Sequence, residues 1–370
     1  MLLSGIFPPI TTPFYPDGQV YHKKLEANVE RYSRTPAAGI VVLGSTGEAI
    51  LLSDQERRDV LKTAMAAAAP NKVMIAGTGI ESAQETLALT EYAAELGYDA
   101  AMVRTPHYYK KQMLPANILA FYRTVADRSP LPIVIYNFPQ ATGYDIPAEV
   151  VIELADHPNV ISIKESSGNL EKVKKMVDGT RHVKRSATVT ETFEAVTPRM
   201  FKAATAESAK QSRELVTVEA LAGSVERRMP SPVPDSGSPK PSSSAVSVVG
   251  KLKTRQKEVG FQVMVGAAHQ LEPSLGMGAV GAILAFACPA PMACYEIYAA
   301  LKEGDIALAR EKQERVKLPA QRIVSELGVP GVKYAMELNG YYGGTSRLPF
   351  LPLSADLKAE IERLMAGIRS

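Results

Sequence analysis

Lys164 has the sequence setting most suggestive of chemistry, because it directly follows the apolar run VISI at residues 160–163. A run of this kind is typical of a strand buried in a parallel sheet. At the edge of a barrel such a lysine would be partly desolvated, and desolvation lowers the lysine pKa from its usual value of about 10.4. A neutral amine attacks carbonyl carbon and forms a Schiff base. Most lysines at strand ends are simply solvated, so the neighbouring motifs decide between the two interpretations.

Polar residues also follow the other apolar runs, in an order that a barrel would bring together. The second run ends in GSTGE at 44–48, where glycine lets backbone amides approach an anion and two hydroxyls can bind a carboxylate or relay protons. Later runs end in GTG at 77–79, TPHYY at 105–109 and YNFP at 136–139. Catalytic residues of barrel enzymes lie at the carboxyl ends of the strands. Each motif is weak alone, but their order and spacing together predict one site.

Short apolar runs and amphipathic stretches of helical length alternate along the chain. The runs occupy residues 6–12, 39–43, 73–76, 101–103, 133–136, 160–163, 263–265 and 280–285. Stretches such as 55–69 and 83–96 separate most of them. Eight strands separated by helices predict an α/β fold of the (β/α)8 type, a TIM barrel. Three further helical stretches, 305–327, 332–339 and 355–368, predict a helical C-terminal extension.

A segment that breaks this alternation lies between the sixth helix and the seventh strand of the predicted barrel. Residues 230–244 hold five prolines and six serines, a composition that cannot bury enough surface to become ordered. Residues 181–260 carry 14 Lys and Arg against 8 Asp and Glu, so the positive charge of the chain is concentrated there. The segment is either a solvated insertion or a docking surface for a partner. We therefore expect a catalytic barrel over 1–180 and 260–303, a low-complexity, partly disordered insertion over 181–259, and a helical extension over 304–370.

The position of the insertion predicts that it does not touch substrate. Loops that join a helix to the following strand open on the face of the barrel opposite to the catalytic one. Deleting residues 185–253 should therefore leave turnover close to that of the full chain. The first half of the insertion, 190–228, contains no proline except Pro198 and could be helical.

Composition narrows the classes of protein to consider. A chain of 370 residues with 46% hydrophobic and 22% charged residues is ordinary for a soluble globular protein with a large core. A net charge of +3 gives no reason to expect nucleic acid or a membrane as a partner. Two cysteines, Cys288 and Cys294, are too few for a disulfide framework, and no secretory signal is visible, so we expect a cytoplasmic protein. The five histidines are scattered without ligand spacing, so we expect no metal, and Schiff-base chemistry needs no cofactor.

The chain resembles the dihydrodipicolinate synthase / N-acetylneuraminate lyase family of class I, pyruvate-dependent aldolases. The resemblance covers residues 5–180 and 260–355 nearly continuously. It rests on four segments: GSTGE at 44–48, YNFP at 136–139, IKE at 163–165 and RLP at 347–349. It implies a (β/α)8 barrel with C-terminal helices, usually assembled as a homotetramer that is a dimer of dimers.

The resemblance also implies a role for each residue that matches a family motif. Lys164 would form the imine with the keto carbon of pyruvate or of another 2-oxo acid. Tyr136 would act as general acid and base beside that carbon, and Ser45 would pass protons between Tyr136 and Tyr108, a tyrosine that enters from a neighbouring subunit. A tyrosine with a pKa of about 10 needs such a relay at neutral pH. The residues implied to contact substrate are Gly44, Thr46, Ala141, Ser166, Gly266 and Ile283.

Two departures from the family pattern bear on the substrate. Ala141 stands where dihydrodipicolinate synthases carry an arginine that grips the carboxylate of aspartate semialdehyde, and a methyl group cannot make that contact. Gly266 is followed by two alanines, where sialic-acid lyases carry an acidic pair that holds sugar hydroxyls. Thr46 replaces an asparagine found in some 4-hydroxy-2-oxoglutarate aldolases, which the chain otherwise resembles at 105–110, 278–281, 331–333 and 340–344. We therefore expect cleavage of 4-hydroxy-2-oxoglutarate to pyruvate and glyoxylate.

Two other functions stay open. Among enzymes, the alternative is a dihydrodipicolinate synthase that condenses pyruvate with aspartate semialdehyde. Ala141 disfavours it, and Arg181 and Arg185 lie at the start of the insertion, on the wrong face to replace the missing arginine. In another class, the chain could be a non-catalytic sensor of a 2-oxo acid. A sensor needs no proton relay, so the residues around Lys164 disfavour this function.

Overall fold

The computed structural model of the chain describes residues 1–192, 194–206, 247–249 and 252–368. The chain forms two compact units. The larger unit comprises Leu3–Arg185 and Val259–Ser370, and it contains every motif that carries the family resemblance; the smaller comprises Met1–Leu2 and Ser186–Glu258. The predicted domain boundaries at 180, 260 and 304 stay a prediction.

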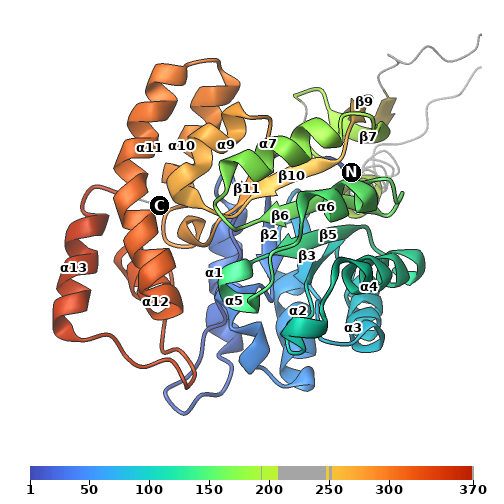
Figure 1. The fold of residues 1–370 in the computed structure, drawn as a ribbon. Helices are drawn as coiled ribbons and strands as arrows, with labels where there is room; N and C mark the ends of the chain where they lie inside the picture. Colours follow the sequence, from blue (N-terminus) through green and yellow to red (C-terminus); the bar gives the residue numbers. More distant parts are fainter. Residues whose placement is uncertain (193, 207–246, 250–251, 369–370) are drawn as a thin grey trace, which may run out of the picture. The chain divides into compact units, whose positions relative to one another are not determined.

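Eight parallel strands of the larger unit form a barrel, as predicted (Figure 1). They are β1 Gly5–Phe7, β2 Gly39–Val42, β3 Val73–Gly77, β4 Ala100–Arg104, β5 Ile133–Asn137, β6 Val160–Glu165, β10 Gln262–Val265 and β11 Gly281–Ile283. Their order in the sheet is β1-β11-β10-β6-β5-β4-β3-β2. Hydrogen bonds from the Ala38 amide to the Ile6 carbonyl (2.9 Å) and from the Val41 amide to the Pro8 carbonyl (3.0 Å) join the two ends of this order. The strands are buried on both faces, which explains why each appears in the sequence as an apolar run.

The register of the central strands decides which side chains share one layer of the barrel interior. Arg104 of β4 pairs with Tyr136 of β5, and Tyr136 pairs with Lys164 of β6. Successive side chains of a strand point to opposite faces, so residues paired across parallel strands point to the same face. Lys164 is buried inside the barrel, and the next residue, Glu165, forms an ion pair with Lys172 of a covering helix.

Helices cover the outer face of the barrel (Figure 1). They are α1 His22–Ser33, α2 Asp54–Ala67, α3 Ala83–Leu96, α4 Pro115–Arg128, α6 Ala148–Ala155, α7 Leu170–Gly179, α9 Leu271–Gly276 and α10 Pro291–Lys302. The predicted helices at 55–69 and 83–96 correspond to α2 and α3. Ser53 and Glu56 form a capping box that begins α2, and Gly97, in the left-handed conformation, ends α3. In the described part of the chain, no helix is long and apolar enough to cross a membrane; the cytoplasmic location stays a prediction.

The predicted C-terminal helical extension is confirmed and belongs to the same unit as the barrel. It consists of α11 Ile306–Ala320, a π-helical segment Gln321–Glu326, α12 Gly328–Leu338 and α13 Ala355–Met365. Figure 1 draws these helices in orange to red. They account for the three helical stretches predicted after the eighth strand.

A buried ion pair joins this extension to the GSTGE turn. Lys333 of α12 is 1% exposed, and its ammonium lies 2.5 Å from the carboxylate of Glu48. The ammonium also donates to the carbonyls of Thr12 (2.9 Å) and Thr345 (2.7 Å). The second carboxylate oxygen of Glu48 accepts from the amide of Arg347 at 2.8 Å. The two opposite charges thus compensate one another, and the turn that precedes α2 is held by residues from the far end of the chain.

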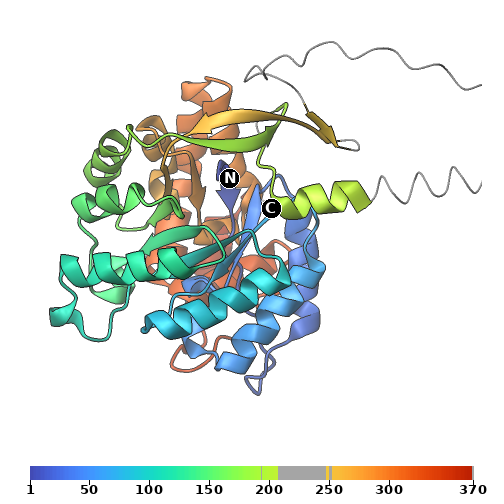
Figure 2. The same ribbon diagram turned by 90° about the vertical axis from the view of Figure 1, so that its right-hand side faces the viewer.

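The smaller unit contains a three-stranded sheet that the sequence did not predict. Its order is β7-β9-β8, with β7 Arg185–Thr190, β8 Ser247–Val249 and β9 Leu252–Val259. Figure 2 shows β7 and β9 side by side, and Gln256 of β9 makes hydrogen bonds to Ser186 (2.8 Å) and Thr188 (3.1 Å) of β7. Within 190–228, a range that could be helical by its sequence, the structure describes a helix over 198–206. The remainder of that range from 207 onward, and the predicted disorder at 230–244, lie outside the described residues.

Arg185 belongs to the larger unit and lies at the end of the barrel opposite to Lys164. Its guanidinium donates to the carbonyls of Val160 (2.8 Å), Ala155 (2.6 Å) and His157 (2.8 Å) around the start of β6. Lys164 lies at the other end of that strand. Arg185 is therefore on the face where the sequence placed it, and it cannot reach a substrate bound at Lys164.

Substitutions in the Lys333–Glu48 ion pair test how much the C-terminal extension stabilises the barrel. Lys333→Met leaves a carboxylate buried without its cation, so we expect the free energy of unfolding to fall by about 3–5 kcal/mol. Combining Lys333→Met with Glu48→Gln removes both charges and should restore much of that loss. Urea unfolding followed by circular dichroism measures both variants. Equal losses in the single and double variants would contradict a role for the ion pair.

A shortened chain tests the expectation that the insertion takes no part in catalysis. Because Arg185 holds carbonyls of the barrel, the deletion has to begin after β7 and not at 185. Removing residues 191–253 and joining Thr190 to Thr254 by a short Gly-Ser turn should change kcat by less than about twofold, since the loop opens on the non-catalytic face. As a control, Arg185→Ala in the full chain should lower the melting temperature. A large loss of kcat in a shortened chain of unchanged oligomeric state would refute this expectation.

Candidate active site

Lys164 lies near the carboxyl end of β6 with its side chain in the barrel. It is 5% exposed, and burial lowers the pKa of its amine to about 7. Its Nζ lies 4.2 Å from the centroid of the Tyr136 ring, a contact that favours the ammonium form. The loss of hydration is the larger effect. A sizeable fraction of Lys164 is therefore the neutral amine at neutral pH, and this is the form that attacks a carbonyl carbon.

Tyr136 and Ser45 form a hydrogen-bonded pair next to this amine. The Tyr136 hydroxyl lies 3.2 Å from Oγ of Ser45, which begins the short 3-10 turn Ser45–Gly47. Burial raises the pKa of Tyr136 to about 12, and the hydrogen bond between Tyr136 and Ser45 opposes this shift. A phenol of this kind stays protonated at neutral pH, so it moves protons only together with a partner. Ser45 is exposed and connects the buried hydroxyl to solvent or to a further group.

The backbone around the turn at 44–48 adopts conformations that are unusual for residues other than glycine. Leu43, which precedes the turn, and Glu48, its last residue, have φ angles of 61° and 55°. Such angles are uncommon for residues with a Cβ and persist where surrounding contacts fix them. Gly77 of β3 makes room for the turn, because a Cβ there would lie 2.2 Å from the Leu43 carbonyl oxygen. Neighbouring strands thus fix the direction in which Ser45 points.

Tyr108, predicted to extend the relay, is not part of it within one chain. The side chain is 75% exposed, and its ring packs against Tyr109 with the centroids 5.2 Å apart. Within the described ranges, no hydrogen bond joins it to Ser45. Glu81 fixes the backbone here by accepting from the amides of His107 (2.9 Å) and Tyr108 (3.1 Å). The predicted homotetramer, in which Tyr108 would serve a neighbouring subunit, stays a prediction.

Three of the residues implied to contact substrate lie at the carboxyl ends of β6, β10 and β11, strands that neighbour one another in the sheet order. Ser166 follows β6, and its Oγ is buried with no hydrogen-bond partner among the residues that the structure describes. Gly266 packs on it so closely that a Cβ would lie 1.9 Å from that Oγ. Ile283, on β11, is fully buried. In the described part of the chain the Ser166 hydroxyl thus has no hydrogen-bond partner, and the missing side chain of Gly266 leaves the space that this hydroxyl occupies.

The other three residues that the resemblance implies to contact substrate, Gly44, Thr46 and Ala141, follow β2 and β5. Gly44 lines the same pocket as Ser45, and Thr46 is buried beside it. Ala141 is exposed on the short helix α5 Pro139–Thr142, which directly follows β5. Its methyl group offers a substrate no charge and no hydrogen bond.

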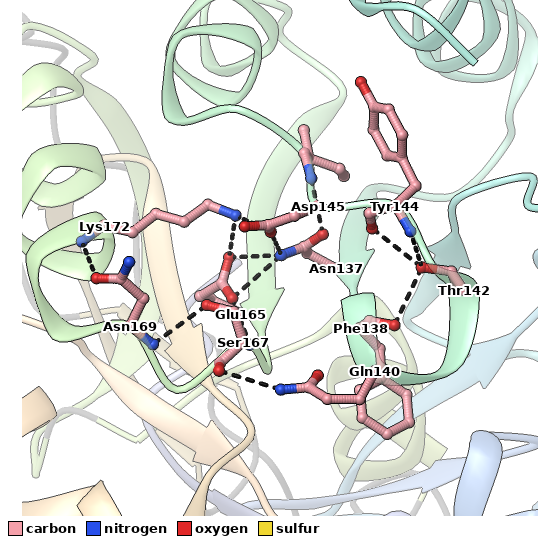
Figure 3. Close-up of polar contacts among 11 residues, drawn as sticks. Asn137, Phe138, Gln140, Thr142, Tyr144, Asp145, Glu165, Ser167, Asn169 and Lys172 are labelled. Atoms are coloured by element: carbon pink, nitrogen blue, oxygen red, sulfur yellow. Dashed lines mark hydrogen bonds and ion pairs between the residues drawn. The ribbon is translucent and has the colours of Figure 1, made fainter. Parts of the chain in front are cut away.

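A network of polar contacts at Glu165, the residue that follows Lys164, holds the carboxyl ends of β5 and β6 together (Figure 3). The buried Glu165 carboxylate accepts from Nδ2 of Asn137 (3.1 and 2.9 Å) and from the amide of Ser167 (2.6 Å). It also forms an ion pair with Lys172 of α7 at 3.2 Å. Lys172 and Asn137 both contact Asp145 as well. Because Asn137 follows Tyr136 and Glu165 follows Lys164, the network fixes the Tyr136 and Lys164 positions relative to one another.

An arginine that the sequence motifs did not point to also lies at this edge of the barrel. Arg104 ends β4 and lines a pocket together with Ser45, Tyr136 and Arg57 of α2. The predicted strand 101–103 stopped one residue too early to include it. A signal was present in the sequence, because Arg104 is two residues after the apolar Met102 and therefore points to the same face. Met102 lines the same pocket.

Other reactive groups are scarce around this site. Within the described parts of the chain, no group of three or more His, Cys, Asp and Glu side chains could hold a metal ion. Cys288 and Cys294 are free and buried, and burial raises the pKa of both thiols, which makes them poor nucleophiles. The amine of Lys164 is thus the nucleophile that the geometry offers.

A (β/α)8 barrel that carries a buried amine and a tyrosine–serine pair at the carboxyl ends of its strands has the architecture of a Schiff-base lyase. The chain belongs to the dihydrodipicolinate synthetase family, whose model matches residues 2–205 and 237–367. It is therefore an enzyme, a carbon–carbon lyase with a lysine Schiff-base mechanism. The predicted family is confirmed, whereas the finer likeness to 4-hydroxy-2-oxoglutarate aldolases stays a prediction.

Similar proteins span nearly the whole chain at modest identity. The 4-hydroxy-tetrahydrodipicolinate synthase of Exiguobacterium sp. is 27% identical over 360 residues, which cover 97% of this chain and 96% of that protein. The synthase of Xanthomonas campestris pv. campestris is 41% identical over 177 residues, 48% of this chain and 58% of that protein. The crystal structure of a dihydrodipicolinate synthase from Bacillus anthracis has a TM-score of 0.74 at 20% identity and covers 99% and 98% of the two chains. The crystal structure of Escherichia coli YagE has a TM-score of 0.72 at 23% sequence identity, and the match covers 100% of this chain and 99% of YagE. These two structures establish likeness of fold.

The lowered pKa of Lys164 predicts how imine formation depends on pH. Below about pH 7 the amine is mostly protonated, so the rate of imine formation should rise about tenfold per pH unit and level off above that value. Trapping the pyruvate imine with cyanoborohydride, followed by mass spectrometry across this pH range, measures the rate. A rate that keeps rising to about pH 10 would mean that Lys164 titrates like an exposed lysine.

Proposed function

We propose that this enzyme binds pyruvate as an imine on Lys164 and makes or breaks a carbon–carbon bond to a short aldehyde that carries a carboxylate. The observation that carries this proposal is the buried amine of Lys164 next to the Tyr136–Ser45 pair. Further support comes from YagE, a protein of similar fold whose crystal structure is a complex with pyruvate.

In the cleavage direction, the proposed mechanism needs one nucleophile and one proton relay. The Lys164 amine condenses with the keto carbon of a 4-hydroxy-2-oxo acid and releases water. As the bond between C3 and C4 breaks, its electron pair moves towards the iminium, and the proton of the C4 hydroxyl passes to the Tyr136–Ser45 pair. The aldehyde leaves, the pair returns the proton to C3, and water hydrolyses the imine to release pyruvate. Condensation is the same sequence in reverse.

For the aldehyde, our proposal from the sequence is glyoxylate, released from 4-hydroxy-2-oxoglutarate. The residue that supports it is Ala141, which gives the carboxylate of aspartate semialdehyde no cation at the position where a synthase has arginine. The segments 331–333 and 340–344, similar to that branch of aldolases, add to this support.

The second candidate is condensation of pyruvate with aspartate semialdehyde, the 4-hydroxy-tetrahydrodipicolinate synthase reaction. It is supported by two relatives that carry this name. One is 27% identical and covers 97% of this chain, and the other is 26% identical and covers 98%. The names of these relatives favour the synthase, and Ala141 favours the 4-hydroxy-2-oxoglutarate aldolase. Both candidates use the same imine and differ in the aldehyde.

Two parallel assays decide between them. One measures release of pyruvate and glyoxylate from 4-hydroxy-2-oxoglutarate, and the other measures condensation of pyruvate with aspartate semialdehyde. Lys164→Ala should reduce either activity to background, because it removes the amine proposed to form the imine. Lys174→Ala, on the exposed face of α7, is the matched control and should leave both unchanged.

Each outcome of these assays has a distinct meaning. Release without condensation would establish the aldolase and make Ala141 a specificity residue. Condensation without release would establish the synthase and overturn the inference from Ala141. Absence of a pyruvate imine on Lys164 in a folded chain would refute the proposed function as a whole.

A further inference from the structure

Arg104 and Lys164 point into the same layer of the barrel from either side of Tyr136. The register pairs Arg104 with Tyr136 and Tyr136 with Lys164. Neighbouring strands lie about 4.8 Å apart, so the backbones of Arg104 and Lys164 are separated by about 10 Å. An arginine side chain and a short carbon chain held on the Lys164 amine can together span that distance. Arg104 also lines the pocket that contains the Tyr136–Ser45 pair.

Among the described residues, only Nη1 of the Arg104 guanidinium makes polar contacts with other side chains. Nη1 lies 3.0 Å from Oε1 of Glu81 and 2.8 Å from Nδ1 of His107. Among the residues that the structure describes, Nε and Nη2 have no hydrogen-bond partner. These two nitrogens form the edge of a guanidinium that binds a carboxylate through two parallel hydrogen bonds. The ion pair with Glu81 holds the group in place and leaves this edge available.

The surroundings of Arg104 suit an anionic ligand. Arg57 brings a second guanidinium to the same pocket. Burial, followed by the charge of Arg104, lowers the pKa of His107, which keeps this imidazole neutral at neutral pH. Gly79 provides the space for the arginine, because a Cβ at that position would lie 2.9 Å from Cγ of Arg104.

We propose that Arg104 binds a carboxylate at the far end of the substrate and so selects 2-oxo acids and aldehydes that carry one. This inference rests on the proposed function, since Lys164 must first hold the keto carbon. Arg104 would supply the cation that is missing at position 141, and it would do so from the end of β4, whereas Ala141 follows β5. Both candidate aldehydes, glyoxylate and aspartate semialdehyde, carry the carboxylate that Arg104 would bind. The proposal therefore defines the class of substrate whichever of the two is used.

Imine trapping tests this proposal without turnover. Pyruvate, 2-oxoglutarate and 2-oxopentanoate are each incubated with the enzyme and cyanoborohydride, and the concentration for half-maximal modification of Lys164 is measured by mass spectrometry. The last two compounds have the same chain length and differ in the distal carboxylate. We expect the wild type to be trapped by 2-oxoglutarate at about 10- to 100-fold lower concentration than by 2-oxopentanoate, which is the effect of a charge-assisted pair.

Three variants separate carboxylate binding from a structural role of the arginine. Arg104→Met should bring the ratio between the two compounds to about one, and Arg104→Lys should restore part of it as a point charge. Glu81→Gln removes the ion pair but keeps the guanidinium, so the ratio should persist. Trapping by pyruvate, which has no distal carboxylate, should be similar in all four proteins.

The results that would overturn the proposal are equally specific. A wild type without preference for 2-oxoglutarate, or an Arg104→Met variant that keeps the preference, would refute carboxylate binding by Arg104. If Arg104→Met and Glu81→Gln weakened trapping of all three compounds equally, Arg104 would be a structural residue. If pyruvate itself were not trapped on Lys164, the proposed function would fail first, and this inference with it.

Discussion

The parallel pairing of β4, β5 and β6 is the constraint on which the site depends. One register places Arg104, Tyr136 and Lys164 in a single layer, and a shift of one residue would turn any of them out of the barrel. Burial of that layer gives Lys164 its low pKa and Tyr136 its high one. The same physical cause, loss of hydration, thus produces a neutral amine and a protonated phenol side by side at neutral pH.

The alternation of side chains along β6 also places Lys164 and the charged residue Glu165 on opposite faces of the strand. Lys164 points into the barrel, where its amine is deprived of water, whereas Glu165 points outward to Asn137 and Lys172. A carboxylate on the inner face would stabilise the ammonium and return Lys164 towards an ordinary lysine pKa. By keeping acid and amine on opposite faces of β6, the barrel fixes the strand through the ion pair of Glu165 and leaves the Lys164 amine apart from that carboxylate.

The barrel and its central residues could be predicted because buried parallel strands leave contiguous apolar runs in the sequence, and Lys164, Tyr136 and Ser45 sit at their ends. Arg104 was missed for a related reason, since a charged residue was taken as the end of its run. The smaller sheet was missed because β9 is a polar, charged segment without an apolar run. Long-range pairings such as Lys333 with Glu48 leave no local pattern, and the sequence gives no sign of which charged residues will be buried together.

The ion pair between Lys333 and Glu48 has a consequence for the order in which the enzyme becomes active during synthesis. Glu48 and the turn that carries Ser45 leave the ribosome early, whereas Lys333 follows only after the whole barrel has been made. Until then the turn lacks the cation that compensates its buried carboxylate and the backbone contacts that come with it. A nascent barrel can therefore contain every strand while the turn that places Ser45 beside Tyr136 is not yet held in its final position.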